Sequence, residues 1–130
     1  MASIFTRIIK GEIPCYKIAE NDSYFAFLDI APVSIGHTLV IPKVEVDYIF
    51  DLDHETFLGL HAFSKRVAMA IEKAISCERI GQTVLGLEVP HAHVHLVPLV
   101  NMQFIDFNKR MKLSQEEFEV TRDKIVSHFM

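Results

Sequence analysis

Apolar and polar residues alternate in short runs through the N-terminal third of the chain. The runs YKIAE (16–20), YFAFLDI (24–30) and HTLVIP (37–42) are rich in β-branched and aromatic residues, and the turn-forming stretches NDS and APVSIG separate them. This pattern predicts antiparallel strands joined by short connections.

The middle of the chain changes to a helical spacing. From Phe57 to Ala74, apolar residues recur three and four positions apart, with Ser64 completing the series. Either Asp51 or Asp53 is a plausible N-cap. We therefore expect a long amphipathic helix that packs against the sheet.

Strand-like and helical patterns then follow each other once more. The stretches TVLGLEV (83–89) and HVHLVPLV (93–100) are β-rich, and Ser114 and Glu117 have the spacing of a capping box ahead of a second helix. Strands, helix, strands and helix in this order predict an α+β fold, with an antiparallel sheet of about five strands and two helices. Because the chain shows no repeat and no linker-like composition, we expect residues 1–130 to form one domain.

One predicted strand carries three of the seven histidines. In the stretch PHAHVHLVP (90–98), His91, His93 and His95 occupy alternate positions, which share one face of a strand but would splay around a helix. We expect the strand to begin near Pro90, because proline is tolerated at a strand start. The intervening residues then point into the core, namely Ala92, Val94 and Leu96.

Three explanations compete for this row of histidines. A merely exposed polar face gives no reason for histidine at each position. A metal site would use two adjacent histidines with ligands from elsewhere, because the outer two lie roughly 13 Å apart in a straight strand. A phosphoryl-transfer site would use the middle imidazole as nucleophile and its neighbours as donors and acids. The third explanation is favoured, while a metal-binding protein that uses His91 or His93, and a nucleotide-binding module with little turnover, stay open.

Composition argues against several classes of function. The formal net charge of −4 and the lack of a Lys/Arg run argue against a protein that binds nucleic acid. No run of about 18 apolar residues occurs, so we expect no membrane partner. Arg7, Lys10 and Glu12 interrupt the apolar N-terminal stretch and argue against a secretory signal, and the two cysteines are too few for a disulfide framework. We expect a cytoplasmic protein.

The motif HAHVHLV (91–97) matches the pattern His-φ-His-φ-His-φ-φ, where φ is apolar, at every position. With this motif and the stretches IFTRIIKGEIP (4–14), AFLDI (26–30) and GHTLVIPK (36–43), the chain resembles the histidine triad (HIT) family of nucleotide hydrolases and transferases. The similarity is to the phosphoramidase-like branch of that family. It covers roughly residues 3 to 98 and implies a HIT-like fold.

The resemblance also implies which residues form the site. His93 corresponds to the nucleophile, which attacks the α-phosphorus and forms a covalent nucleotidyl-histidine. His91 and His95 correspond to flanking residues that orient the nucleophile, bind phosphate oxygens and assist leaving-group protonation, and His37 joins them from a neighbouring strand. Asp29 corresponds to the carboxylate that accepts hydrogen bonds from the ribose hydroxyls. The apolar positions implied to surround the base are Ile4, Phe5, Ile8, Phe27, Ile30 and Leu39.

A substrate class and an assembly follow from the same resemblance. The implied substrate is a purine nucleoside 5′-monophosphoryl compound: a phosphoramidate, an acyl-adenylate or a dinucleoside polyphosphate. The implied reaction needs no cofactor. The implied assembly is a homodimer with two-fold symmetry.

Departures from the family pattern bear on the site. Ser3 and Thr6 stand where many members carry the Cys-x-x-Cys of a structural zinc site, so we expect no metal ligands. The GQTV run occurs earlier than usual, and Glu88 stands where a hydroxyl commonly contacts the phosphate. A carboxylate there repels a phosphate unless it turns away or is paired. Leu99 replaces an arginine that often follows the triad in bacterial relatives, which removes another phosphate partner.

Overall fold

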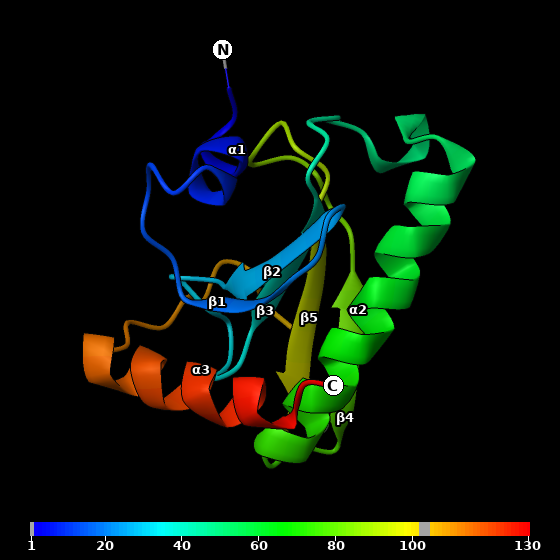
Figure 1. Cartoon of the computed structure of the whole chain (residues 1–130). Coiled ribbons are helices and arrows are strands. Elements are labelled where there is room, and N and C mark those ends of the chain that lie inside the picture. Colours follow the sequence, from blue (N-terminus) through cyan, green and yellow to red (C-terminus); the bar gives the residue numbers. More distant parts are fainter. Residues whose placement is uncertain (1, 102–104) are drawn as a thin grey trace.

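An antiparallel sheet lies at the centre of the protein (Figure 1). The computed structural model describes residues 2–101 and 105–130. The five strands of the sheet lie in the order β1-β2-β3-β5-β4, and all neighbours are antiparallel, which confirms the predicted sheet. The strands are β1 (Lys17–Glu20), β2 (Tyr24–Leu28), β3 (Thr38–Pro42), β4 (Arg79–Thr83) and β5 (Val94–Leu99).

Two helices follow the predicted capping signals. α2 (His54–Ala74) begins after Asp53, whose carboxylate accepts a hydrogen bond from a backbone N–H of the first turn, so the second of the two candidate caps is used. α3 (Gln115–His128) begins after Ser114 in the predicted capping box with Glu117. α2 packs on one face of the sheet, and α3 contacts α2 and β1 (Figure 1). Among the described residues, no helix combines the length and the apolar character needed to cross a bilayer.

A short N-terminal helix, α1 (Ile4–Ile9), adds to the two predicted helices. Its N-cap is Ser3, whose hydroxyl accepts a hydrogen bond from the N–H of Thr6. The expectation of two helices is therefore too low, because a segment this short and rich in β-branched residues carries no clear helical signal. A single 3-10 turn, Ile49–Asp51, precedes α2.

The predicted strand at residues 83–89 is wrong. β4 begins earlier and ends at Thr83, which pairs with His95 of β5. Because the two strands run antiparallel and β5 begins only at Val94, residues 84–89 run past the end of their partner and form a loop. β5 begins after His93 and not near Pro90 as predicted, because its pairing with β3 starts only at Val94, so only the last histidine of the row lies within a strand.

The two faces of the sheet bury different side chains. The larger apolar cluster lies between the sheet and α2 and includes Ala92, Val94 and Leu96, as the predicted alternation requires. The histidines belong to the opposite face, where the ring of Phe5 packs against the ring of His93. A smaller cluster covers this second face, formed by Phe5, Phe25, Phe27, Leu39 and Ile41. Helix α1 thus provides the aromatic ring that covers the row.

Candidate active site

The structure brings the three histidines of the row together and buries them. Their exposed fractions are 0% for His91, 3% for His93 and 4% for His95. His95 lies opposite Leu39 of β3, and its ring centroid is 5.0 Å from that of His93 in a T-shaped arrangement. His93 and His95 therefore place adjacent imidazoles on the face of the sheet away from α2.

The middle histidine is oriented by the backbone of its neighbour. Nδ1 of His93 lies 2.8 Å from the carbonyl oxygen of His91, and since a carbonyl only accepts, Nδ1 carries the proton and donates it. Nε2 of a neutral His93 then carries a lone pair. Within residues 2–101 and 105–130, Nε2 has no hydrogen-bond partner, although every buried polar side-chain atom there has one, so this nitrogen reaches solvent.

The tautomer of His95 follows from a chain of hydrogen bonds that starts in the turn before β3. The N–H of Val33 donates to Nδ1 of His37 at 3.1 Å, so the proton of a neutral His37 is on Nε2. That nitrogen lies 2.9 Å from Nδ1 of His95 and donates to it. His95 must then carry its own proton on Nε2. Gly36, at φ +97°, gives the backbone the left-handed turn that presents His37 to this chain.

Burial keeps this pair of histidines neutral. Desolvation, with the nearby positive charge of Arg110 as the next cause, lowers the pKa of His37 to about 3. Desolvation and the neighbouring His37 lower the pKa of His95 to about 3 as well. The neutral His95 thus presents an N–H donor next to the ring of His93.

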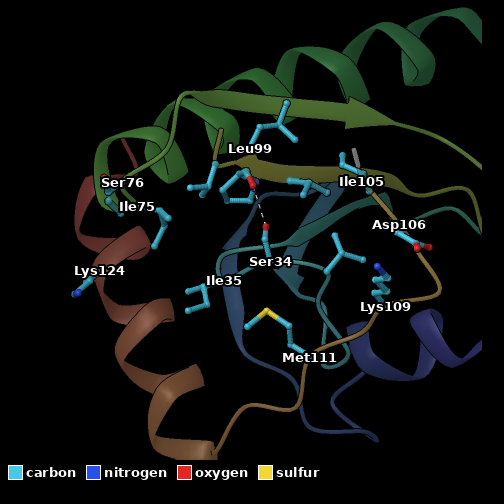
Figure 2. Close-up of a pocket in the computed structure, with 15 residues that line it drawn as sticks. Ser34, Ile35, Ile75, Ser76, Leu99, Ile105, Asp106, Lys109, Met111 and Lys124 are labelled. Carbon is cyan, nitrogen blue, oxygen red and sulfur yellow. Dashed lines mark hydrogen bonds between the residues drawn. The ribbon is translucent and has the colours of Figure 1, made fainter. Parts of the chain in front are cut away.

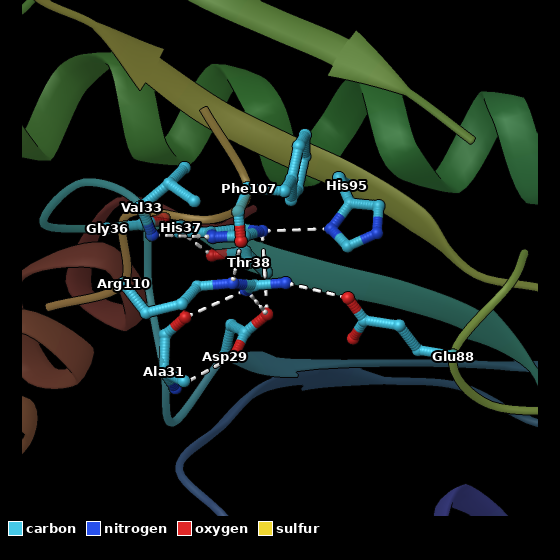
Figure 3. A network of polar contacts seen from close by, with 10 residues as sticks. All are labelled: Asp29, Ala31, Val33, Gly36, His37, Thr38, Glu88, His95, Phe107 and Arg110. Carbon is cyan, nitrogen blue, oxygen red and sulfur yellow. Dashed lines mark hydrogen bonds and ion pairs between the residues drawn. The ribbon is translucent and has the colours of Figure 1, made fainter. Parts of the chain in front are cut away.

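Asp29 lies just beyond β2 and joins the same network (Figure 3). Its Oδ1 accepts a hydrogen bond from the N–H of Ala31, and its Oδ2 lies 3.6 Å from Nε2 of His37. Oδ2 is also 3.3 Å from Nη1 of Arg110, whose Nη2 lies 3.0 Å from Oε1 of Glu88. Glu88, the residue expected to repel a phosphate, is therefore paired with a cation.

Arg110 and Phe107 are site residues that the sequence does not reveal. The ring of Phe107 packs edge-on against His95 and His37, with centroids 4.9 and 6.0 Å apart. Arg110 is separated from Asp29 by 81 positions in the chain and belongs to no sequence motif that we identified. A basic residue in a loop is common, so only the fold could show that this one returns to the histidines.

The segment at residues 105–111 borders a cavity of about 610 Å³ (Figure 2). The cavity lies between the end of α2, the end of β5 and this segment, and Asp106 and Lys109 form part of its wall. Phe107 and Arg110 of the same segment contact the histidine network. The segment therefore covers the row with one side and lines the cavity with the other.

At the other end of the row, His91 is held by both ring nitrogens. Nε2 donates to the carbonyl oxygen of Pro42 at 2.8 Å, so Nδ1, 2.8 Å from the hydroxyl of Ser3, accepts from it. Burial lowers the pKa of His91. Its ring has no nitrogen left for a phosphate oxygen in this structure, whereas its carbonyl orients His93.

The carboxylate of Glu45 joins Ser3, Thr6 and His91 in one cluster of hydrogen bonds. Oε1 of Glu45 accepts hydrogen bonds from the hydroxyl of Thr6 at 2.6 Å and from the N–H of Ser3 at 2.7 Å. These bonds, that from Thr6 first, lower the pKa of Glu45 to about 2. The cluster ties helix α1 to the loop after β3 and to the histidine row.

The residues expected around a base are only partly gathered. Phe5, Phe27 and Leu39 are buried together beside the histidines, and Ile8 packs against them. Ile4 and Ile30 are 48% and 71% exposed. The buried members can form the wall of a cleft, and the two exposed isoleucines lie at the surface.

Neither end of the row fits a metal ion well. Ser3, Thr6, Glu45 and His91 offer two neutral hydroxyls among four groups, which are poor ligands for zinc. At the other end of the row, one possible ligand atom from each of three residues lies within 4.8 Å of the others: Asp29, His37 and His95. There a hydrogen bond joins the two imidazoles and the guanidinium of Arg110 contacts the carboxylate, so a further cation would meet repulsion.

Comparisons with known proteins agree with this architecture. The sequence pattern of the HIT domain matches residues 10–102. The adenosine 5′-monophosphoramidase of Schizosaccharomyces pombe is 39% identical over 106 residues, which cover 80% of this chain and 79% of that protein. A Hit-like protein of Bartonella henselae superposes with a TM-score of 0.88 at 30% identity, covering 97% of this chain and 95% of that one. A Zn-bound histidine triad family protein of Mycobacterium smegmatis has a TM-score of 0.82 at 28% identity, with 98% and 95% covered. This chain belongs to the HIT family.

Proposed function

We propose that the protein is a nucleotide hydrolase that transfers a nucleoside monophosphoryl group to His93 and then to water. One observation carries the proposal: the solvent-reaching lone pair of His93 Nε2 is fixed by the carbonyl of His91 and stands beside the N–H of His95. Membership of the HIT family and the similarity to an adenosine 5′-monophosphoramidase support a nucleotide hydrolase.

The reaction has two displacements at the α-phosphorus. In the first, the lone pair of His93 Nε2 forms a bond to phosphorus, and the bond to the leaving group breaks with its electron pair on the departing nitrogen or oxygen, which takes up a proton. In the second, water attacks the nucleotidyl-histidine and gives a proton to a base. His93 recovers its lone pair as the nucleoside monophosphate departs.

His95 supplies the proton and later accepts it. Its pKa of about 3 leaves it neutral in the protein alone. A phosphate anion beside Nε2 stabilises the imidazolium and raises this pKa, so the acid forms when the substrate is in place. The second proton enters at Nδ1, which requires the Nε2–H of His37 to stop donating there. Burial thus delays protonation until a negative charge is present.

The neighbouring residues hold the nucleotide. Asp29 accepts hydrogen bonds from the ribose hydroxyls, and its carboxylate is already fixed by the N–H of Ala31. Phe5, Phe27 and Leu39, with Ile8 at their edge, provide an apolar wall for a purine base. Ile4 and Ile30 are exposed, and only the family resemblance assigns them to the base.

The experiment is AMP release from adenosine 5′-phosphoramidate without added metal. The His93→Ala variant is expected to lose turnover by about 10³-fold or more while still binding AMP. The control is His54→Ala, an exposed histidine of α2 that should leave turnover unchanged. Mass spectrometry of the quenched reaction should show one adenylyl group on His93. Equal turnover by His93→Ala rules out the mechanism, and AMP binding without turnover in the unaltered protein supports a binding module instead.

A substrate panel identifies the leaving group. Phosphoramidates, acyl-adenylates and diadenosine polyphosphates share the adenylyl group and differ only in what departs. The ratio of kcat/KM values across the panel measures the preference of the site for an amine, an acid or a nucleotide.

Two broader expectations extend this proposal. Residues 1–130 form one domain. This is supported by the packing of α3 on α2 and β1, although α3 lies outside the residues that match the family pattern.

The protein forms a homodimer, supported by the family resemblance and by exposed apolar side chains beside the end of β4, among them Leu85 and Leu87. Light scattering of the unaltered protein and of Leu87→Glu tests the dimer. The cytoplasmic location stays a prediction.

A further inference from the structure

In the part of the chain that the structure describes, an arginine contacts the two carboxylates beside the histidines. Asp29 and Glu88 are carboxylates beside the row, and His37 and His95 are neutral because the pKa of each lies at about 3. Within the described residues, the positively charged side chain that contacts both carboxylates is Arg110. Without it, an incoming phosphate would meet two negative charges.

Arg110 is held in a defined orientation by its other contacts. Nε donates to the carbonyl oxygen of Phe107 at 2.9 Å, and Nη1 donates to the carbonyl oxygen of Ala31 at 2.8 Å and to Asp29. The guanidinium also lies over the ring of Phe107, 5.2 Å from its centroid. These contacts fix the plane of the guanidinium and leave Nη2 as the nitrogen that faces Glu88.

We propose that Arg110 is the phosphate-binding cation of this cleft, and that a substrate phosphate takes the place that the Glu88 carboxylate holds in this structure. The proposal rests on the proposed function, since it assumes that a nucleotide occupies the cleft. It assigns to residue 110 the role that the replacement at Leu99 seemed to remove.

The Glu88 contact is the one that can be exchanged at low cost. The side chain of Glu88 is 67% exposed, so the ion pair is screened by water and its carboxylate can turn into solvent. Arg110 is only 22% exposed and keeps its contacts to Ala31 and Phe107 through other nitrogens. A phosphate can therefore replace Glu88 at Nη2 while the guanidinium stays in place, and Glu88 competes with the substrate.

The position of Arg110 in the chain explains why the family motifs do not point to it. Arg110 lies after residues 10–102, which match the family pattern, in the covering segment at residues 105–111. That segment thus places the ring of Phe107 against His95 and the guanidinium of Arg110 beside Asp29.

The test is calorimetric titration of the full chain with AMP and with adenosine, which lacks the phosphate. Arg110→Gln should weaken AMP binding by about tenfold or more, because a charge-assisted contact is lost, and change adenosine binding by less than about threefold. Arg110→Lys should give an intermediate AMP affinity. Glu88→Gln should tighten AMP binding, because a competing carboxylate is removed.

The matched control is Lys109→Gln, which removes the same charge from the adjacent residue. Lys109 is exposed and lines the cavity on the other side of the segment, so its loss should leave both affinities unchanged. Thermal unfolding of each variant checks the fold. Glu88→Gln alters an exposed side chain and tests the exchange independently of any disturbance caused by replacing Arg110.

The outcomes separate this inference from the proposed function. If the unaltered protein binds AMP and Arg110→Gln binds it as tightly or more tightly, the guanidinium only covers the cleft and the assignment fails alone. If Arg110→Gln weakens adenosine as much as AMP, Arg110 acts on Asp29 and the ribose, which also overturns it. If the unaltered protein binds neither ligand, the proposed function fails and the assignment falls with it.

Discussion

At one end of the histidine row both ring nitrogens of His91 have protein partners, whereas at the other end His95 uses one nitrogen for His37 and keeps an N–H for a ligand. The partners differ in kind. His91 contacts Ser3 and the backbone of Pro42, while His95 contacts the imidazole of His37, which itself lies beside the Asp29 carboxylate that Arg110 contacts. The same type of side chain is thus held by the protein through both nitrogens at one end, whereas at the other end it keeps a donor that the proposed function uses.

The largest expected effect is a loss of catalytic rate that distinguishes the two ends of the histidine row. His95→Gln should lower kcat by about 10²–10³-fold, because the acid that protonates the leaving group is lost. It should change the unfolding free energy little, since glutamine can accept from His37. Steady-state kinetics on adenosine 5′-phosphoramidate with parallel urea denaturation measures both quantities.

The matched variant at the other end is His91→Gln. It should destabilise the protein by about 1–3 kcal/mol, because a single amide group cannot reach both buried partners that the two ring nitrogens bind, at Pro42 and Ser3. Its kcat should fall less than that of His95→Gln, because the backbone carbonyl that orients His93 remains. If both variants lose kcat equally and stability equally, the two ends do not differ in role.

The next effect is a pH dependence that originates at the His95 end. The pKa of His37 and of His95 is about 3 in the folded protein, against about 6.5 in an unfolded chain. Between these values only the unfolded state binds the protons, so the unfolding free energy falls as the pH is lowered below about 6.5. The slope is up to about 1.4 kcal/mol per pH unit for each histidine.

Urea denaturation at pH 7 and pH 5 measures this slope. His37→Asn, which cannot be protonated, should lower the slope, while the exposed His54→Asn should leave it unchanged. A slope that is the same in all three proteins would show that the buried pair does not resist protonation.

The smallest effect concerns the cluster that holds His91. Ser3→Ala removes both the N-cap of α1 and the donor to His91, and should cost about 1–2 kcal/mol of stability. Ser3→Thr keeps the hydroxyl and is the control. Turnover should fall little in either variant, because the contacts of His95 are untouched; a large loss of kcat in Ser3→Ala would show that α1 positions the nucleophile more directly than the geometry indicates.

Periodicity accounts for the parts of the fold where local sequence and burial agree. The long helix α2 and the capping box of α3 follow from apolar spacing and from cap residues, which act within a few positions. The loop at residues 84–89 shows where this reasoning ends, because alternation resembles a strand whether or not a partner strand lies beside it. The same holds for α1, which is stabilised by contacts with distant residues more than by its own composition.

The sequence by itself determined the order of the sheet strands and of the two longer helices, the alternation that places three imidazoles on one side of the chain, and the family to which they point, because these depend on neighbours within a few residues. Only the tertiary structure decided the tautomers of His91 and His95, the pairing of Glu88 with Arg110 and the shielding by Phe107. The position of a proton and the energetic effect of a charge depend on every group within hydrogen-bond reach, and most of those groups belong to remote parts of the chain.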